Sequence, residues 1–356
     1  MSSENFYNDP LFGNQTLEPP WESVYNDGAK GGGEIKLQLS LACGDFDLNR
    51  ALVAGTVQPD GIELIAQTMS SPERHRRMLK HEEFDVCEFS LSTYLLTHQA
   101  GKPFIAIPVF PHRRFRHSYV FCRSDAGIET PAGLTGKRIG LDTLQNTAGL
   151  WMRGILQDCH GLPLESIRWW TQEEEDIPVE PSLTLSAERV PRGTDIDAML
   201  CRGELEAVIY PEILPSFAKG SPKVRRLFKD HKQAEREYYQ WTGIFPIMHT
   251  VVIHTRILER HPWVPANLLK AFRAAKEHAY RQQEDPRRFA LVWVGELLEE
   301  QRQLMGPDPW PYNLNDNRLA LETLVRYAFE QGLLKRKPPV EELFAESSLE
   351  ETPRYV

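Results

Sequence analysis

The stretch FDVCEFSLSTYLLTHQAGKPFIAIPVF (84–110) contains two apolar segments separated by a more polar one. Its two apolar ends, 84–89 and 104–110, are each typical of a short buried strand. The residues between them are typical of a helix that ends at a glycine. Strands that alternate with helices in this way predict an α/β fold, in which a mainly parallel sheet is covered by helices.

The same alternation extends through most of the chain on both sides of this stretch. Further strands are predicted at 35–42, 62–67, 118–124, 134–141 and 205–210. Helices are predicted at 48–57, from Ser71-Pro72 as cap and first turn to about Lys80, and from Thr147 to about His160 before Gly161. In the last hundred residues, helices are predicted to begin at Pro265, at Asp285-Pro286 and at Asn315 or Asp316. We expect their apolar stripes to belong to the core, including Leu268, Leu269, Phe272, Ala275 and Ala279, and then Phe289, Trp293, Leu297 and Leu304.

Length and charge narrow the class of protein. The 356 residues are too many for one comfortable core, so two domains or lobes are expected. The formal net charge of −9 argues against a nucleic-acid partner, because such binding needs clustered Lys and Arg. No apolar run approaches the roughly 18–20 residues that span a bilayer, so no membrane span is predicted.

The cysteines and the N-terminal segment favour a cytoplasmic protein. The five cysteines are scattered and form no CxxC pair, which is typical of free thiols in a reducing compartment. Residues 1–34 form a polar arm without a basic n-region or an apolar h-region, so they do not resemble a secretory signal. Trp21 and Tyr25 in this arm favour a homo-oligomer, in which the arm wraps onto a partner subunit.

The stretch FPHRRFRHSY (110–119) concentrates positive charge in an acidic chain. Arg113, Arg114 and Arg116 cannot all be buried without partners, since an unpaired buried charge costs several kcal/mol. They either form salt bridges at the surface or hold carboxylates, for which arginine has the bidentate geometry. The spacing of His112 and His117 alone is a weak metal signal, and no HExxH or Cys/His cluster supports it. We therefore predict no metal site, and the lack of GxGxxG and GxxxxGK[ST] also argues against a nucleotide cofactor.

Polar residues follow several of the predicted strands, where ligands bind in open α/β sheets. They are Glu88, Ser90 and Ser92 after 84–89, the basic stretch after 104–109, Gln145-Asn146-Thr147 after 134–141, and Tyr210 at the end of 205–210. Ser92 and Thr147 could instead be simple helix caps, although a cap can also contact a ligand. His249 stands just before an apolar strand and is either a hydrogen-bonded core residue or part of the site.

Long stretches of the chain resemble the 4,5-dihydroxyphthalate decarboxylase family. They are FDVCEFSLSTYL (84–95), GKPFIAIPVFPHRRFRHSYVFCRSDAGI (101–128), LTGKRIGL (134–141), NTAGLWMRGILQD (146–158), FPIMHTVVI (245–253), HPWVPANLLKAF (261–272), DPWPYNLNDNRLALETLVRYAFEQGL (308–333) and EELFA (341–345). The resemblance covers about residues 35 to 346, and it departs from the family pattern at His112, in the loop 171–193 and in the first 33 residues.

The resemblance implies a fold similar to the type II periplasmic binding proteins, with two α/β lobes and the ligand between them. Lobe one is then expected at 35–118 plus 250–356, and lobe two at 119–249. Each lobe is expected to hold a mostly parallel sheet flanked by helices, and the C-terminal part to be helical. The two segments that pass from one lobe to the other would bring the basic stretch 110–119 and His249 to the cleft between the lobes.

The resemblance also implies decarboxylation of 4,5-dihydroxyphthalate to protocatechuate and CO2 without a cofactor. Arg113 and Arg116 fit the family motif FPxRxFRH and are expected to hold the carboxylates. Neutral donors would come from Ser90, Ser92 and Thr147, and a further carboxylate partner from Arg153. His117 or His249 is expected to donate the proton, with Glu88 as the base or as the residue that orients the histidine. A decarboxylase for a related hydroxylated aromatic diacid and a non-catalytic binding protein for an aromatic acid remain alternatives.

Overall fold

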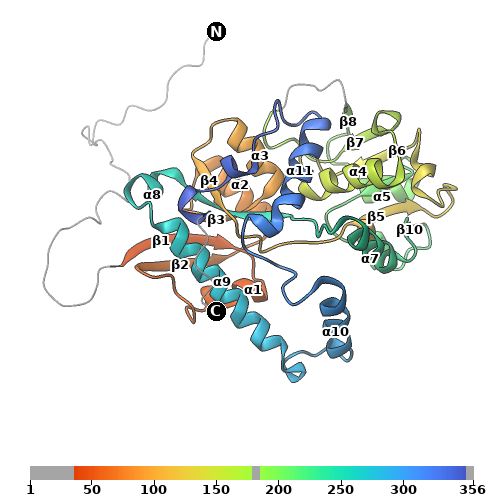
Figure 1. Ribbon diagram of the computed structural model, residues 1–356. Coiled ribbons are helices and arrows are strands. Elements are labelled where there is room, and N and C mark those ends of the chain that lie inside the picture. Colours follow the sequence, from red (N-terminus) through yellow and green to blue (C-terminus); the bar gives the residue numbers. More distant parts are fainter. Residues whose placement is uncertain (1–35, 179–184, 350–356) are drawn as a thin grey trace, which may run out of the picture. The chain divides into compact units, whose positions relative to one another are not determined.

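The strands form two mixed sheets, and the first sheet contains the strands that come earliest in the sequence (Figure 1). The computed structural model describes residues 36–178 and 185–349. The strand order is β2-β1-β3-β11-β4. The strands are β1 (Leu37–Cys43), β2 (Ile62–Thr68), β3 (Val86–Ser90), β4 (Phe104–Ile107) and β11 (His249–His254). Only β11 runs against the direction of the other described strands of this sheet.

The second sheet is built from the middle of the chain, in the order β10-β5-β9-β6-β7-β8. Its strands are β5 (Val120–Arg123), β6 (Arg138–Leu141), β7 (Arg168–Thr171), β8 (Ala187–Arg189), β9 (Ala207–Ile209) and β10 (Val224–Arg226). Among the described strands of this sheet, β5 alone runs against the rest. The sequence pattern does not predict β7, β8 and β10, because each contains arginine and none forms a continuous apolar run.

The expectation of mostly parallel sheets flanked by helices is confirmed, with one reversed strand in each sheet. The reversed strands β5 and β11 are the first strands after the chain passes from one sheet to the other, along 108–119 and 227–248. A connection through a helix in the same sheet keeps successive strands parallel, and these two strands have no such connection. The lobe boundaries at 118 and 249 stay predictions, and the predicted arm at 1–34 lies outside the described residues.

The helices of the first two thirds of the chain each lie between two successive strands. They are α1 (Asp47–Val53), α2 (Ser71–His81), α3 (Leu91–Gln99), α4 (Thr147–His160), α5 (Ile196–Arg202), α6 (Pro215–Ala218) and α7 (His231–Thr242). The cap position of α2 is Ser70, and its side chain makes no capping hydrogen bond, so the prediction of Ser71 as the cap was wrong by one residue. Helix α4 has its predicted bounds and ends at Gly161, whose φ of 62° is in the left-handed region that favours glycine.

The C-terminal part of the chain is helical, and its last α-helix packs against helices of both sheets. Its α-helices are α8 (Thr255–Arg260), α9 (Val264–Gln283), α10 (Val294–Met305) and α11 (Arg318–Glu330). The predicted stripe of α9, including Leu268 and Phe272, is buried as expected. Helix α11 packs against α4 so closely that a Cβ on Gly154 would clash with the ring of Tyr327. Tyr327 also donates a hydrogen bond to Asp158 over 2.9 Å.

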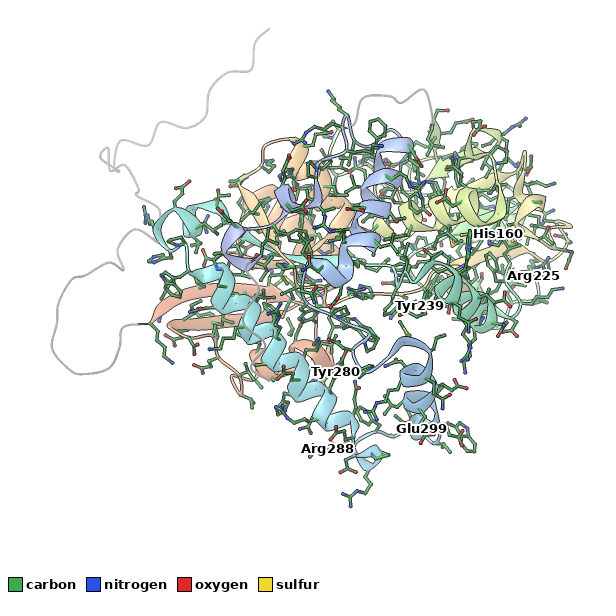
Figure 2. The ribbon with its side chains drawn as sticks, viewed as in Figure 1. His160, Arg225, Tyr239, Tyr280, Arg288 and Glu299 are labelled. Carbon is green, nitrogen blue, oxygen red and sulfur yellow. The ribbon has the colours of Figure 1, made fainter. Side chains whose placement is uncertain are left out.

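The expectation that α10 belongs to the core was wrong. No residue of α10 is buried, and Trp293 and Leu297 are 65% and 49% exposed. Asp285 caps the short 3-10 helix at Pro286–Arg288 rather than α10 itself. Figures 1 and 2 show why: α10, with Glu299, lies beside the C-terminal end of α9 and away from both sheets. An amphipathic pattern predicts a helix but not the surface that covers its apolar face.

The described cysteines are all free, and no helix in the described ranges is long and apolar enough to cross a membrane. Cys43, Cys87 and Cys122 are buried, and Cys159 and Cys201 are half-buried. Burial raises the pKa of the Cys43 thiol to about 12, so this group stays protonated and unreactive.

Candidate active site

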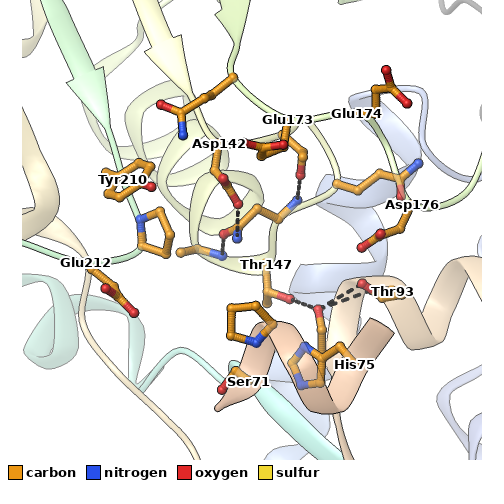
Figure 3. A pocket seen from close by; sticks show the side chains of 18 of the residues that line it. Ser71, His75, Thr93, Asp142, Thr147, Glu173, Glu174, Asp176, Tyr210 and Glu212 are labelled. Carbon is orange, nitrogen blue, oxygen red and sulfur yellow. Dashed lines mark hydrogen bonds between the residues drawn. The ribbon is translucent and has the colours of Figure 1, made fainter. Parts of the chain in front are cut away.

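A cavity of about 1330 Å³ is lined by segments of both sheets and by the beginnings of α2, α3 and α4 (Figure 3). Three residues at the ends of strands lie on its wall: Ser90, the last residue of β3, and Asp142 and Tyr210, which directly follow β6 and β9. These are carboxyl ends of strands, where side chains from different strands converge in open α/β sheets. The position predicted from the sequence for a ligand therefore coincides with a cavity.

A buried chain of three side chains, Arg74, Glu88 and His249, ends at this cavity. Glu88 Oε1 accepts a hydrogen bond from His249 Nδ1 over 2.5 Å and pairs with Arg74 Nη2 at 3.0 Å. Glu88 Oε2 accepts a hydrogen bond from the backbone N–H of Gly44 over 2.7 Å. Glu88 is 1% exposed and does not line the cavity, whereas His249 does. The carboxylate is thus placed to orient the histidine and not to contact a ligand.

The pairing of β3 with β11 explains why these side chains meet. Ser90 lies opposite His249, and Glu88 lies opposite Val251, in an antiparallel register. Residues two apart on a strand share a face, so Glu88, Ser90 and His249 all project from the same side of the sheet. Arg74 reaches Glu88 from α2, where it also donates from Nε to the Glu88 carbonyl over 2.7 Å.

Burial and nearby positive charge keep His249 neutral. Its pKa lies well below the usual value, first because of burial and then because of Arg74 and Arg116. A neutral ring that donates from Nδ1 to Glu88 has its lone pair on Nε2. Nε2 has no hydrogen-bond partner among the residues that the structure describes. The bond to Glu88 also favours the imidazolium form once an anion offsets the arginines.

Two further histidines flank His249 on the cavity wall. The ring centre of His75 lies 4.9 Å from that of His249, and the ring centre of His112 lies 4.6 Å away, both edge-on. Burial, followed by His249 and Arg116, lowers the pKa of His112 to about 2, so this ring is also neutral. His75 Nε2 and His112 Nδ1 are buried without a partner in the described chain. From the sequence, His112 is only a weak metal signal and a departure from the family pattern, and His75 is not predicted to belong to the site.

Hydroxyl groups and helix N-termini form an anion-friendly part of the same wall. Ser90 caps α3, and its Oγ lies 2.9 Å from Thr147 Oγ1 at the start of α4 (Figure 3). Thr93 donates to Ser90 Oγ over 3.1 Å. Ser90, Thr93 and Thr147 line the cavity, while Ser92 lies behind them and donates to the Gln145 carbonyl over 2.5 Å. The positive ends of two helix dipoles therefore point at the cavity together with polarised hydroxyls.

The basic stretch divides between the cavity and the interior. His112, Arg114 and Arg116 line the cavity. Arg116 is 3% exposed and donates to the Pro211 carbonyl over 2.7 Å. Burial lowers its pKa to about 9, so the guanidinium is still cationic at neutral pH.

Three other predicted site residues do not reach the cavity lining. Arg113 donates to Asn317 Oδ1 and, over 3.3 Å, to the Phe245 carbonyl. His117 packs between Phe228 and Tyr238, with ring centres 5.0 and 5.5 Å away, and burial lowers its pKa to about 4. Arg153 donates to Gln331 Oε1 over 2.7 Å and to the Leu144 carbonyl over 2.6 Å. Protein partners hold all three, so the structure does not bring them together with His249.

The opposite wall carries a carboxylate that the sequence analysis missed. Asp142 immediately follows β6 and accepts a hydrogen bond from Asn146 Nδ2 over 3.2 Å. Burial, followed by repulsion from Glu173, raises its pKa to about 6. Tyr210 lies on this wall, and burial raises its pKa to about 12. Asp142 could have been found by the rule that selected Ser90, because it ends a predicted strand.

Within residues 36–178 and 185–349, no group of three or more His, Cys, Asp or Glu side chains could hold a metal ion.

Solved structures of known proteins share the architecture described above. No family model matches the sequence. The periplasmic aliphatic sulphonate-binding protein SsuA of Escherichia coli superposes with a TM-score of 0.52 at 14% identity, over 87% of this chain and 97% of that chain. A sulfonate-binding protein of Methylobacillus flagellatus gives 0.51 at 14% identity, over 88% and 92% of the two chains. These likenesses confirm the two-lobed fold of the type II periplasmic binding proteins.

Two curated sequences are much more similar. A 4,5-dihydroxyphthalate decarboxylase of Comamonas testosteroni is 37% identical over 324 residues, which covers 88% of this chain and 98% of the relative. A 4,5-dihydroxyphthalate decarboxylase of Pseudomonas putida is 39% identical over 212 residues, which covers 58% of this chain and 82% of the relative. Identity at this level over nearly the whole relative shows the family. The chain belongs to the 4,5-dihydroxyphthalate decarboxylase family.

Proposed function

We propose that this protein decarboxylates 4,5-dihydroxyphthalate to 3,4-dihydroxybenzoate (protocatechuate) and CO2 in the breakdown of phthalate. The observation that carries the proposal is the chain from Arg74 through Glu88 to His249, which presents an oriented imidazole to a cavity beside a buried Arg116. The names of the two curated relatives support the choice of substrate.

The substrate makes the reaction possible without an external electron sink. Direct loss of CO2 would leave an aryl carbanion, which is too basic to form. Each ring hydroxyl, however, lies para to a carbon that carries a carboxylate. Ionisation of that hydroxyl moves electron density to the para carbon, which then accepts a proton. The C–C bond breaks as the ring regains aromaticity, so the protein needs to supply an acid, a base and a carboxylate site.

His249 is the proposed proton donor to the ring carbon. The free site keeps its imidazole neutral, because burial and two arginines lower its pKa. A bound dianion acts in the opposite direction, since nearby negative charge stabilises an imidazolium. Glu88 already accepts from Nδ1, so the protonated ring has a counter-charge in place. Substrate binding is thus expected to load His249 with the proton that the reaction consumes.

Arg116 and the hydroxyl cluster are the proposed carboxylate site. Arg116 supplies a buried cation, and Ser90, Thr93 and Thr147 supply neutral donors at the beginnings of α3 and α4. Charge-assisted hydrogen bonds of this kind are roughly twice as strong as neutral ones. We no longer place Arg113, Arg153 and His117 in contact with substrate, and propose that they hold the walls of the cavity, because protein groups surround them.

The test is to incubate the purified full-length protein with 4,5-dihydroxyphthalate and measure CO2 and protocatechuate. Equimolar formation of both supports the proposal. The likeness to sulfonate-binding proteins favours one alternative, a binder of aromatic acids that does not turn over. Saturable binding without CO2 release would establish that alternative. A panel of hydroxylated aromatic and heteroaromatic diacids would identify a related substrate that turns over faster.

We also propose that the protein works as a homo-oligomer in the cytoplasm. The distribution of free cysteines is compatible with a reducing compartment, because the described thiols form no disulfide. Light scattering on the purified protein measures the oligomeric state directly, and a monomer at all concentrations would refute the first part.

A further inference from the structure

The cavity has two walls whose recessed groups differ in chemistry. Its rim carries exposed charges of both signs, such as Arg192 and Glu174, which do not distinguish the walls. Deeper in, the wall at the end of β3 presents His249 and the start of α3, with Thr147 of α4 against Ser90. Arg116, from the segment that passes between the sheets, lies beside this wall, with its Nε 3.1 Å from Met248 Sδ. The wall from the second sheet presents Asp142 instead (Figure 3). One recessed wall therefore attracts carboxylates, and the other repels them and accepts hydrogen bonds from hydroxyl groups.

Asp142 is held in a defined position by the start of α4. Asn146 Nδ2 donates to Asp142 Oδ2 over 3.2 Å, and Asn146 Oδ1 accepts from the backbone N–H of Ala148 over 2.9 Å. Asp142 Oδ1 has no hydrogen-bond partner within residues 36–178 and 185–349 and is not buried out of reach. One carboxylate oxygen is thus fixed by the protein, and the other is available to a ligand.

This division matches the layout of the substrate. The carboxylates of 4,5-dihydroxyphthalate lie on one edge of the ring, and its hydroxyls lie on the opposite edge. An acid that protonates the carbon and a base that takes the para hydroxyl proton must therefore act from opposite sides. Glu88 cannot be that base, because it is enclosed by Arg74, Gly44 and His249 and does not line the cavity.

We propose that Asp142 is the base that accepts the proton of the ring hydroxyl para to the departing carboxylate, an inference that rests on the proposed decarboxylation. The O–H bond breaks, and its proton goes to Asp142 Oδ1 while the ring accepts the electron pair. The para carbon takes a proton from His249, and the C–C bond then breaks, returning its electrons to the ring as CO2 leaves. Asp142 gives its proton back to the phenolate oxygen, and solvent reprotonates His249. The cycle consumes one proton from solvent.

The surroundings of Asp142 suit a base that works near neutral pH. Burial raises its pKa to about 6, with further raising by Glu173, Glu175 and Asp176 and an opposing effect of the Asn146 hydrogen bond. Tyr210 also lies close, and Asp142 raises the pKa of its phenol. A raised carboxyl pKa means that Asp142 is ionised above about pH 6 and protonated below it. The base is therefore lost as the pH falls through this value.

The first test is the rate of Asp142→Asn. We expect kcat to fall by at least ~10²-fold, the usual contribution of a general base, with loss of the acid limb near pH 6 from the profile of kcat/KM. Glu174→Gln, an exposed rim carboxylate outside the proposed machinery, is expected to keep the wild-type rate and profile. Asp142→Asn with kcat within threefold of wild type and an unchanged acid limb would overturn the inference.

The second test separates this inference from the proposed function, because it measures binding alone. Wild-type protein is expected to bind protocatechuate more tightly than benzoate, which lacks the hydroxyls, and to lose this preference as the pH falls through about 6. Asp142→Asn is expected to lose about tenfold of the preference at pH 7.5, the size of one charge-assisted hydrogen bond, with benzoate affinity unchanged. A preference that is the same in both proteins and at both pH values refutes the role of Asp142. Absence of CO2 release by wild type refutes the decarboxylation and leaves this binding comparison valid.

Discussion

The two faces of the crossover segment 112–117 differ in what they contact, although both are rich in positive charge. His112, Arg114 and Arg116 line the cavity, whereas Arg113 and His117 are held by interior groups. The segment pairs with 246–248 through hydrogen bonds of His112 and Arg114, so its backbone is extended there. Side chains of an extended segment alternate between two sides, which separates Arg113 from His112 and Arg114, and His117 already begins a 3-10 helix. The cluster of charge marks this segment in the sequence. Which of its charged side chains reach a ligand depends on the side of the segment to which each one points.

The largest difference between the faces is expected for the two buried arginines. Arg116→Ala is expected to lower kcat/KM for 4,5-dihydroxyphthalate by about 10²-fold, because it removes a desolvated charge-assisted contact of about 2–5 kcal/mol. Arg113→Ala is the matched control from the other face, with kcat/KM per folded molecule within threefold of wild type. Steady-state rates corrected for the folded fraction measure both. Equal losses in the two variants would mean that the side to which a side chain points does not separate substrate contacts from structural ones.

The interior face is expected to respond in stability instead of rate. Asn317→Ala removes the acceptor of the buried Arg113 guanidinium and is expected to lower the free energy of unfolding by about 1–3 kcal/mol. Urea unfolding measures this change, and kcat/KM at low temperature is expected to stay at the wild-type value. A variant with wild-type stability and impaired kcat/KM would show that Arg113 acts on the substrate after all.

A smaller difference is expected for the two histidines. His112→Phe keeps an aromatic ring against His249 and removes the ring nitrogens from the cavity wall. We expect about a tenfold loss of kcat/KM, or about 1.4 kcal/mol, which is within the range of one neutral hydrogen bond. His117→Phe, in its aromatic enclosure, is expected to change kcat/KM by less than threefold. The reverse order of the two losses would return His117 to the site.

Much of the fold could be predicted from the sequence, because hydrophobic periodicity and the residues that cap helices or form turns are local features. The bounds of α4 and the buried stripe of α9 follow from caps, glycines and apolar spacing. The exposure of α10 could not be predicted, since its pattern is the same as that of a core helix. The difference lies in tertiary packing, which a periodic pattern does not specify.

The site could be predicted only in part for a related reason. Ser90, Thr147 and Tyr210 were found because they end strands or begin helices, and they do line the cavity. His75 and Arg74 sit inside α2, where a charged or polar residue normally faces solvent. Their role depends on which face of α2 meets β3, and the sequence does not show that face. Asp142 also directly follows a predicted strand, but the prediction was placed on Gln145, Asn146 and Thr147 further along the chain.

The most direct test of the account is the turnover number of His249→Gln. This variant removes the proposed proton donor from the Arg74–Glu88 pair, and we expect kcat for CO2 release to fall by at least ~10²-fold with the substrate still bound. His254→Gln is the control, since His254 lies on the same strand and faces Glu82 instead of the cavity. Its kcat is expected to stay within threefold of wild type. A His249→Gln protein that releases CO2 at the wild-type rate would contradict the account.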